Sequence, residues 1–356
     1  MNEERVKRIL KRSDADMLLI SDPFAIYYLT GKMFEPGERF LALLLGKEHE
    51  PVLFVNSLFR FQADLGVKVV YYSDTDDITT VLAEEIDPSC TLGVDKILPA
   101  RFLLPLMENG VARAFVNGSP AVDLTRAAKD KEEQELMRRS SKANDMAMEK
   151  FKKLIHDGVT EIEVADQMMD IYASLGAERY SFPPIVAFGD NAADPHHEPD
   201  GTVIKRGDIV LFDVGCVVNG YCSDMTRTFF YKEGPSPEAK HVYDLVRTAS
   251  EESIKMLKPG VRIGDVDRKA RDIITAGGYG DDFTHRLGHF IGLEDHEFGD
   301  VSETNDMPEM PGYIHSIEPG IYHAGIAGVR IEDLVLITED GCEVLNSYPK
   351  DIEIIG

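Results

Sequence analysis

The chain has 356 residues, 43% hydrophobic and 28% charged, so a sizeable core and two domains are expected. Its formal net charge of −25 argues against nucleic acid or an anionic membrane as a main partner, because both require basic patches. No apolar run approaches the roughly 20 residues that span a bilayer, and the charged N-terminus has no signal-peptide pattern. The four cysteines show neither metal-type spacing nor a disulfide framework, so a reduced, cytoplasmic protein is predicted.

Short apolar runs alternate with helical patterns in the first third of the chain. After an amphipathic N-terminal helix, strands are predicted at 15–21, 39–46, 50–56, 67–73, 90–95 and 112–118, and helices at 77–86 and 99–110. This alternation is typical of a compact α/β domain. Polar residues then take over, which predicts a first domain at 1–124 and a second at 125–356.

Two pairs of helices are predicted in the second domain. The first pair covers 131–158 and 160–176, and the second covers 236–260 and 261–278, with a strand-rich segment between the pairs. "GVTEIEVADQMMDIYASLG" from the first pair aligns with "GVRIGDVDRKARDIITAGG" from the second. The alignment suggests a duplicated helix–helix–strand unit, with chance similarity between two amphipathic helices as the alternative.

A β-hairpin between the helix pairs carries two aspartates. Asn219–Gly220 predicts a two-residue type I′ turn, which needs positive φ at both positions. The resulting register pairs Asp213 with Thr226 and puts Asp213 and Asp224 on one face as diagonal neighbours, with Gly215 leaving room between them. Two converging carboxylates repel each other unless cations lie between them. The hairpin therefore predicts either a dinuclear metal site or two solvated aspartates on an exposed face.

Further candidate ligands follow in the last quarter of the chain. His285, His289 and His296 form the tightest group of histidines. Glu318 ends a predicted strand, and Glu332 lies within another strand that is apolar on both faces, so it is expected to be central and buried. Carboxylates with one imidazole suit Mn²⁺, Co²⁺, Fe²⁺ or Zn²⁺. Two such ions about 3.5–4 Å apart form the two-metal arrangement for hydrolysis.

Four motifs resemble those of a known family: "FDVGCVVNGYCSDMTRTF", "HRLGHFIGLEDHE", "IEPGIY" and "RIEDLVLIT". They resemble the metal-binding motifs of the M24 metallopeptidases, the pita-bread family of methionine aminopeptidase, aminopeptidase P and Xaa-Pro dipeptidase (prolidase). "SFPPIVAFGDNAADPHHEPDG" looks like the substrate-pocket segment of the proline-specific branch. The resemblance implies a creatinase-like α/β N-terminal domain and an α+β pita-bread catalytic domain with an internal pseudo-twofold repeat.

The resemblance also implies a cofactor of two divalent metal ions per subunit, with Mn²⁺ expected and Co²⁺, Zn²⁺ or Fe²⁺ as alternatives. One metal would be bound by Asp213 and the other by His289 and Glu318. Asp224 and Glu332 would bridge both metals. A metal-bridging hydroxide would then attack the scissile carbonyl carbon.

Catalytic and substrate-binding roles follow from the same resemblance. Glu318 would carry the proton to the leaving nitrogen as general acid/base. His296 would stabilise the tetrahedral intermediate, and His196 would contact the substrate near the scissile bond. His285 and Arg330 would shape the pocket, with packing as the alternative role of His285.

Within the family, the intact ligand set argues against the members without metals, and the N-terminal domain argues against methionine aminopeptidase. The compact chain and its resemblance to prolidases around Glu38 and Arg39 favour an Xaa-Pro dipeptidase. Aminopeptidase P, acting on longer peptides, is the alternative, and a non-catalytic binding protein is a remote one. The segment around Glu38 and Arg39 resembles the prolidase loop that reaches the partner subunit's active site, so these residues would face the termini of a dipeptide. An ordinary surface turn is the alternative for this loop, and the resemblance implies a homodimer.

Overall fold

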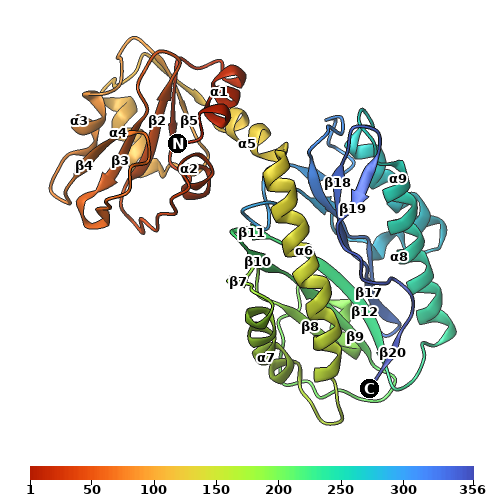
Figure 1. The fold of residues 1–356 in the computed structure, drawn as a ribbon. Helices are drawn as coiled ribbons and strands as arrows, with labels where there is room; N and C mark the ends of the chain where they lie inside the picture. The colour runs from red at the N-terminus through yellow and green to blue at the C-terminus, as the bar shows by residue number, and fades with distance from the viewer. The chain divides into compact units, whose positions relative to one another are not determined.

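The computed structural model describes residues 1–356, which divide into two compact units, Met1–Arg126 and Ala127–Gly356. Figure 1 shows the ribbon of both units, coloured along the chain. Each unit is a mixture of helices and strands. No helix combines the length and the apolar character needed to cross a bilayer.

The N-terminal unit is built on a six-stranded sheet of order β4-β3-β2-β1-β5-β6. Its strands are β1 (Met17–Ile20), β2 (Leu41–Gly46), β3 (Val52–Asn56), β4 (Lys68–Tyr72), β5 (Thr91–Val94) and β6 (Ala114–Asn117). Its helices are α1 (Glu3–Arg12), α2 (Pro23–Thr30), α3 (Ile78–Ala83), α4 (Ala100–Glu108) and α5 (Ser119–Ala127). The mixed sheet with helices confirms the predicted α/β class of this part of the chain.

The sequence pattern did not predict α2. Its apolar residues do not follow a helical period, and half of its eight residues are buried. The start signal is local: Asp22 accepts a hydrogen bond from the Phe24 amide, and Pro23 occupies the first turn. Gly31 ends the helix with φ 73°.

The C-terminal unit contains four long helices and fourteen strands. The helices are α6 (Lys131–Phe151), α7 (Glu161–Ser174), α8 (Pro237–Met256) and α9 (Ile263–Ala276). The strands before α8 are β7 (Arg179–Tyr180), β8 (Ile185–Phe188), β9 (Ile209–Val214), β10 (Cys216–Val218), β11 (Tyr221–Cys222) and β12 (Met225–Tyr231). The strands after α9 are β13 (Gly288–His289), β14 (Asp300–Val301), β15 (Ile314–Ile317), β16 (Gly320–His323), β17 (Ala327–Arg330), β18 (Asp333–Ile337), β19 (Cys342–Val344) and β20 (Ile354–Ile355).

The two helix pairs are structural repeats. Gly158 and Gly260 precede the second helix of each pair with φ of 83° and 86°, and Gly176 and Gly278 follow it with φ of 88° and 93°. These left-handed backbone conformations favour glycine. In each repeat the residue two positions after the first glycine forms an isolated antiparallel bridge to a later loop. The predicted internal repeat is therefore confirmed.

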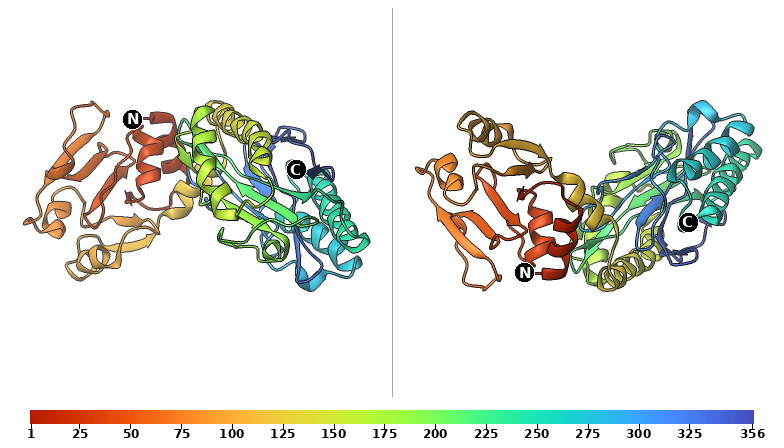
Figure 2. Two further views of the ribbon diagram at one scale, coloured as in Figure 1. Left: turned by 90° about the horizontal axis from the view of Figure 1, so that it is seen from below. Right: turned by 90° about the horizontal axis from the view of Figure 1, so that it is seen from above.

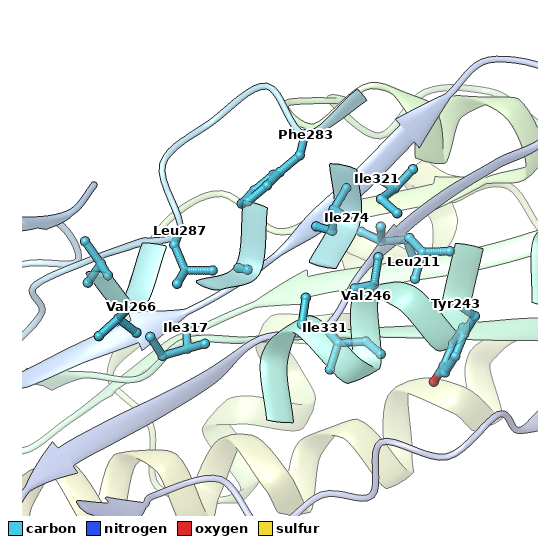
Figure 3. Close-up of a cluster of buried hydrophobic side chains, with 14 of the residues drawn as sticks. Leu211, Tyr243, Val246, Val266, Ile274, Phe283, Leu287, Ile317, Ile321 and Ile331 are labelled. Atoms are coloured by element: carbon cyan, nitrogen blue, oxygen red, sulfur yellow. The ribbon is translucent and has the colours of Figure 1, made fainter. Parts of the chain in front are cut away.

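Strands β9 and β12 are buried on both faces. Leu211 and Phe230 belong to a hydrophobic cluster with α8 and α9, whereas Phe212 and Phe229 belong to a cluster with α6 and α7. Figures 1 and 2 show the two strands between these helix pairs. In Figure 3, Leu211 lies among side chains of the α8–α9 cluster such as Val246. Apolar packing on both sides fixes the strand ends that carry the polar residues described below.

The hairpin turn was predicted correctly. Asn219 and Gly220 have φ of 52° and 81°, as a type I′ turn requires. Thr226 pairs with Asp213 in the β9–β12 ladder, which is the expected register. Both aspartates are buried, with 9% exposure at Asp213 and 4% at Asp224, so the alternative of an exposed hairpin face is wrong.

Glycine is required at position 215 for a different steric reason from the one predicted. A Cβ at this position would lie 2.1 Å from the Ser223 carbonyl oxygen and 2.8 Å from the Phe182 ring. Glycine is therefore required because two backbone segments approach each other here, and not because the aspartates need space between them.

The expected single strand around Glu332 is broken in two. β17 ends at Arg330 and pairs with β16, whereas β18 begins at Asp333 and pairs with β15 and β19. Glu332 lies in the link, and its amide donates to the Thr226 carbonyl at 3.2 Å. The prediction of one continuous strand was wrong, because an apolar run does not mark where the chain changes sheets. Burial of Glu332, 1% exposed, was confirmed.

Candidate metal centre

Carboxylates and imidazoles converge on a cavity of about 540 Å³ in the C-terminal unit. The lining residues are Phe182, Ile185, Pro195, His196, Asp213, Asp224, His285, Arg286, His289, Asp295, His296, Glu318, Arg330 and Glu332. All five predicted metal ligands are among them. The predicted catalytic and pocket residues of this unit line the cavity as well. They come from segments that are more than 130 positions apart in the sequence.

His289 of β13 is at the centre of the carboxylate group. Its Nε2 lies 3.4 Å from Asp224 Oδ2 and 3.5 Å from Glu318 Oε1. Its Nδ1 lies 3.3 Å from the Phe290 carbonyl oxygen, so Nδ1 carries the proton and Nε2 keeps its lone pair. Burial, followed by the neighbouring His296, holds the pKa of His289 well below its usual range. A neutral imidazole that aims a lone pair at carboxylates is suited to bind a cation.

Ser316 of β15 fixes two of these groups relative to each other. Its hydroxyl accepts a hydrogen bond from the His289 amide at 2.9 Å and donates to Glu318 Oε1 at 3.1 Å. Gly288 permits the approach, because a Cβ there would lie 2.1 Å from the Ser316 carbonyl oxygen. The backbone of β13 is thereby held against the strand that presents Glu318.

Arg330 anchors the opposite side of the cavity. Its Nη2 donates to Asp213 Oδ2 at 2.5 Å, its Nε to the Thr226 hydroxyl at 3.1 Å and its Nη1 to the Tyr322 hydroxyl at 2.8 Å. Thr226 in turn donates to Glu332 Oε2 at 2.7 Å. A buried guanidinium with three different acceptors orients both carboxylates.

Tyr322 links Arg330 to His285. The Tyr322 hydroxyl lies 2.7 Å from His285 Nε2, and His285 Nδ1 lies 2.7 Å from the Arg286 carbonyl oxygen. That carbonyl can only accept, so Nδ1 is the protonated nitrogen and Nε2 accepts from the phenol. Burial and the charge of Arg330 lower the pKa of His285 to about 4, which keeps this ring neutral.

Several buried oxygens around the cavity have no hydrogen-bond partner. They are Asp213 Oδ1, Asp224 Oδ1, Glu332 Oε1 and Asp295 Oδ1. Burial, followed by neighbouring carboxylates, raises the pKa of Asp224 and of Glu332 well above the usual range. Burial and, among its neighbours, Asp213 also raise the pKa of Glu318 to about 8. Orphaned buried carboxylate oxygens are costly, and divalent cations would supply their missing partners. The donor set therefore fits oxygen-preferring divalent ions with one imidazole ligand.

His296 lies on the outer side of His289. The two rings stack with centroids 3.8 Å apart. Arg286 Nη2 lies 3.1 Å from His296 Nδ1, and Asp295 Oδ2 lies 3.4 Å from His296 Nε2. Because the guanidinium can only donate, Nδ1 is the acceptor, and the proton of the neutral ring resides on Nε2. His196 lies exposed at the rim of the same cavity.

Two predicted substrate-binding residues do not line this cavity. Glu38 and Arg39 belong to the N-terminal unit. There Arg39 donates to both carboxylate oxygens of Asp74, at 2.8 and 3.0 Å, and pairs with Glu38 at 3.1 Å. His197, next to His196, is bound to Glu161 at 2.7 Å and does not line the cavity either.

The sequence pattern did not single out five residues that contribute to this site: Thr226, Arg286, Asp295, Ser316 and Tyr322. Arg286 and Asp295 are each adjacent in sequence to a histidine that was predicted to belong to the site, and this proximity could have identified them. Polar residues in the apolar stretch 286–296 need partners once buried. Thr226, Ser316 and Tyr322 carry no such signal, because these residue types also occur commonly in strands.

Comparison with family models gives two matches that together cover most of the chain. Residues 135–339 match the metallopeptidase family M24, and residues 4–128 match the creatinase/prolidase N-terminal domain. The chain is 38% identical, over 98% of its length and 99% of the relative's, to an uncharacterized peptidase of Staphylococcus epidermidis.

Solved structures of two kinds of peptidase are similar over the whole chain. An Xaa-Pro dipeptidase from Bacillus anthracis superposes with a TM-score of 0.89 at 30% identity, covering 99% of both chains. An X-Pro aminopeptidase from Thermotoga maritima superposes with a TM-score of 0.85 at 30% identity, covering 99% of this chain and 100% of the other.

Proposed function

Because the chain belongs to metallopeptidase family M24, we propose that it is an Xaa-Pro dipeptidase, which hydrolyses the bond before proline in dipeptides. One observation carries the proposal: four carboxylates and a neutral imidazole converge on a cavity in which several buried carboxylate oxygens have no partner. Likeness to an Xaa-Pro dipeptidase over the full chain supports the choice of substrate.

The proposed ligands of two divalent metal ions are Asp213, Asp224, His289, Glu318 and Glu332. Two such ions supply Lewis-acid polarisation of the peptide carbonyl and activation of water. We propose Mn²⁺ as the metal, since the donors are mainly oxygens with one imidazole and no thiolate. Co²⁺, Fe²⁺ and Zn²⁺ are compatible with the same donors.

Glu318 and His296 have the positions needed to assist the chemistry. The nitrogen of a peptide bond is a very poor leaving group as an anion, so the proline nitrogen must receive a proton in order to leave. Glu318 borders the cavity and is held by Ser316, and it would deliver that proton as general acid/base. His296, with its proton on Nε2, would donate to the oxygen that gains negative charge in the transition state.

The remaining cavity residues would bind and orient the dipeptide. His196 lies at the exposed rim, where it would contact the substrate near the scissile bond. His285 and Arg330 form one wall through Tyr322, and their shared hydrogen bonds give this wall a fixed shape. A preshaped pocket reduces the conformational entropy lost on binding.

The proposal extends to assembly and location. We propose that the protein is a cytoplasmic homodimer in which Glu38 and Arg39 face the termini of the dipeptide bound by the partner subunit. Arg39 is already held by Asp74, so Glu38 would be the freer of the two to meet the substrate. Sedimentation of the purified protein and a Glu38→Ala variant with raised KM would support this arrangement. A monomer with full activity would contradict it.

The direct test is proline release by the Mn²⁺-loaded protein from Met-Pro, with the tripeptide Met-Pro-Gly measured in parallel. Rapid cleavage of the dipeptide alone is expected. Similar rates on both would favour an aminopeptidase P instead, a possibility kept open by the likeness to an X-Pro aminopeptidase. Failure to cleave either peptide, with metal bound, would indicate a binding protein on the same fold.

A further inference from the structure

Asp295 shares a distinctive feature with the proposed metal ligands. Its Oδ1 is buried and has no hydrogen-bond partner, as is also true of one oxygen each on Asp213, Asp224 and Glu332. Only 18% of its side chain is exposed. A buried carboxylate oxygen without a hydrogen-bond partner therefore makes Asp295 as good a candidate for cation binding as three of the proposed ligands.

The position of Asp295 fits a metal-binding role. One ligand atom from each of Asp295, His289 and His296 lies within 4.8 Å of the others. Asp295 also lines the same cavity as the five proposed ligands. Its carboxylate is therefore close enough to His289 to share a cation with it.

Protein donors already hydrogen-bond one oxygen of three of the four proposed carboxylate ligands. Arg330 holds Oδ2 of Asp213, at 2.5 Å. Thr226 holds Oε2 of Glu332 at 2.7 Å, and a serine holds Oε1 of Glu318 at 3.1 Å. Octahedral cations of the Mn²⁺ type take about six ligand atoms each. A further protein oxygen beside His289 would help to complete such a coordination shell.

We propose that Asp295 is a further oxygen ligand of the metal centre, bound through Oδ1 on the side of His289. The contact of its Oδ2 with His296 Nε2, at 3.4 Å, uses the other oxygen and leaves Oδ1 for a cation. An ammonium group of a substrate is a weaker candidate partner, since Oδ1 is not exposed to the cavity solvent. The inference rests on the metal centre proposed above, but not on the choice of substrate.

The test measures cation binding without any peptide. Wild-type protein and Asp295→Asn are freed of metal with a chelator and titrated with Mn²⁺ in a calorimeter. Binding of at least one Mn²⁺ equivalent is expected to weaken about tenfold or more in Asp295→Asn, while Asp295→Glu retains most of the affinity. X-ray absorption of the Mn²⁺-loaded proteins is expected to show fewer oxygen ligands in Asp295→Asn. The matched control is Asp281→Asn, which removes an exposed carboxylate outside the cavity and leaves binding unchanged.

Thermal unfolding of the metal-free proteins provides a second measurement. Metal-free Asp295→Asn is expected to be at least as stable as metal-free wild type, because it removes a charge buried beside other carboxylates. Equal Mn²⁺ affinity and coordination in Asp295→Asn and wild type would overturn the inference, and a raised KM for Met-Pro in that variant would then assign Asp295 to the substrate. Absence of Mn²⁺ binding by the wild type would overturn both this inference and the proposed function. Failure of the Mn²⁺-loaded wild type to cleave peptides would overturn only the proposed function.

Discussion

The Arg330 guanidinium donates a 2.5 Å hydrogen bond to Oδ2 of Asp213, so one oxygen of a proposed metal ligand is already bound to a cation of the protein itself. Both side chains are buried. The other oxygen, Oδ1, has no hydrogen-bond partner, and the orientation of Asp213 depends on an arginine that lies 117 positions away in the sequence.

Replacement of Arg330 by Met is expected to destabilise the metal-loaded protein by about 3–5 kcal/mol. The reason is that Asp213 Oδ2 and the Thr226 hydroxyl each lose a buried charged donor. Urea unfolding of the loaded protein measures the loss. The control is Arg138→Met, which breaks a pair with Glu343 whose side chains are 37% and 39% exposed, and is expected to cost about 1 kcal/mol or less. Equal losses in the two variants would contradict the assigned role of Arg330.

Removal of metal is expected to make stability fall as pH rises. Folding raises the pKa of Glu318 from 4.5 to about 8 and that of Asp295 from 3.8 to about 7, in both cases chiefly through burial. The folded state therefore binds more protons than the unfolded state between these values, and stability present at low pH is lost as pH rises to about 8. Urea unfolding of chelated protein at pH 5 and pH 8 tests this. Added Mn²⁺ is expected to reduce the difference, and a metal-free protein that is more stable at pH 8 would contradict the prediction.

Loss of a proposed bridging carboxylate is expected to abolish activity without unfolding the protein. Asp224→Asn and Glu332→Gln should each lower kcat/KM for Met-Pro by about 100-fold or more, because both proposed metal positions lose a ligand. The same variants should be at least as stable as wild type when metal-free, since each removes a buried charge. Glu343→Gln, outside the cavity, is the control for activity. Near-normal turnover in either variant would rule out the dinuclear arrangement.

Tyr322→Phe tests the wall of the pocket. The phenol oxygen accepts from Arg330 and donates to His285, so its removal takes one hydrogen bond from Arg330 Nη1 and leaves His285 Nε2 without its donor. A loss of about 1–3 kcal/mol in stability is expected, and kcat/KM for Met-Pro should fall about tenfold through KM if the wall only positions substrate. Tyr279→Phe, whose ring does not line the cavity, provides the comparison. A fall in kcat with constant KM would instead place Tyr322 in the chemical step.

Local patterns in the sequence predicted the parts of the fold that local physics determines. The type I′ turn at Asn219–Gly220 fixed the register of Asp213 against Thr226. The helix predicted at 160–176 is present as α7, and Thr160 and Glu163 form a capping box at its start. Each of these features depends on residues close together in the sequence, so a short segment contains the necessary information.

Features that depend on distant segments were not predicted. The break between β17 and β18 is set by which neighbouring strands are available for pairing, and the run around Glu332 contains no residue that marks it. The hydrogen bonds of Arg330 reach Asp213 and Thr226 from another strand, so they appear only once the chain is folded. Asp295 was not predicted, although it lies directly before His296 in the sequence.

The two-residue turn at Asn219–Gly220 also determines which side of the hairpin carries chemistry. Paired residues lie on the same side of a sheet, so Asp224 stays on the side of Asp213 as long as Val218 pairs with Tyr221 and Asp213 with Thr226. A shift of this pairing by one residue would direct Asp224 toward the α6–α7 layer, away from His289. A turn of two residues thus sets the pairing on which the position of a proposed metal ligand depends.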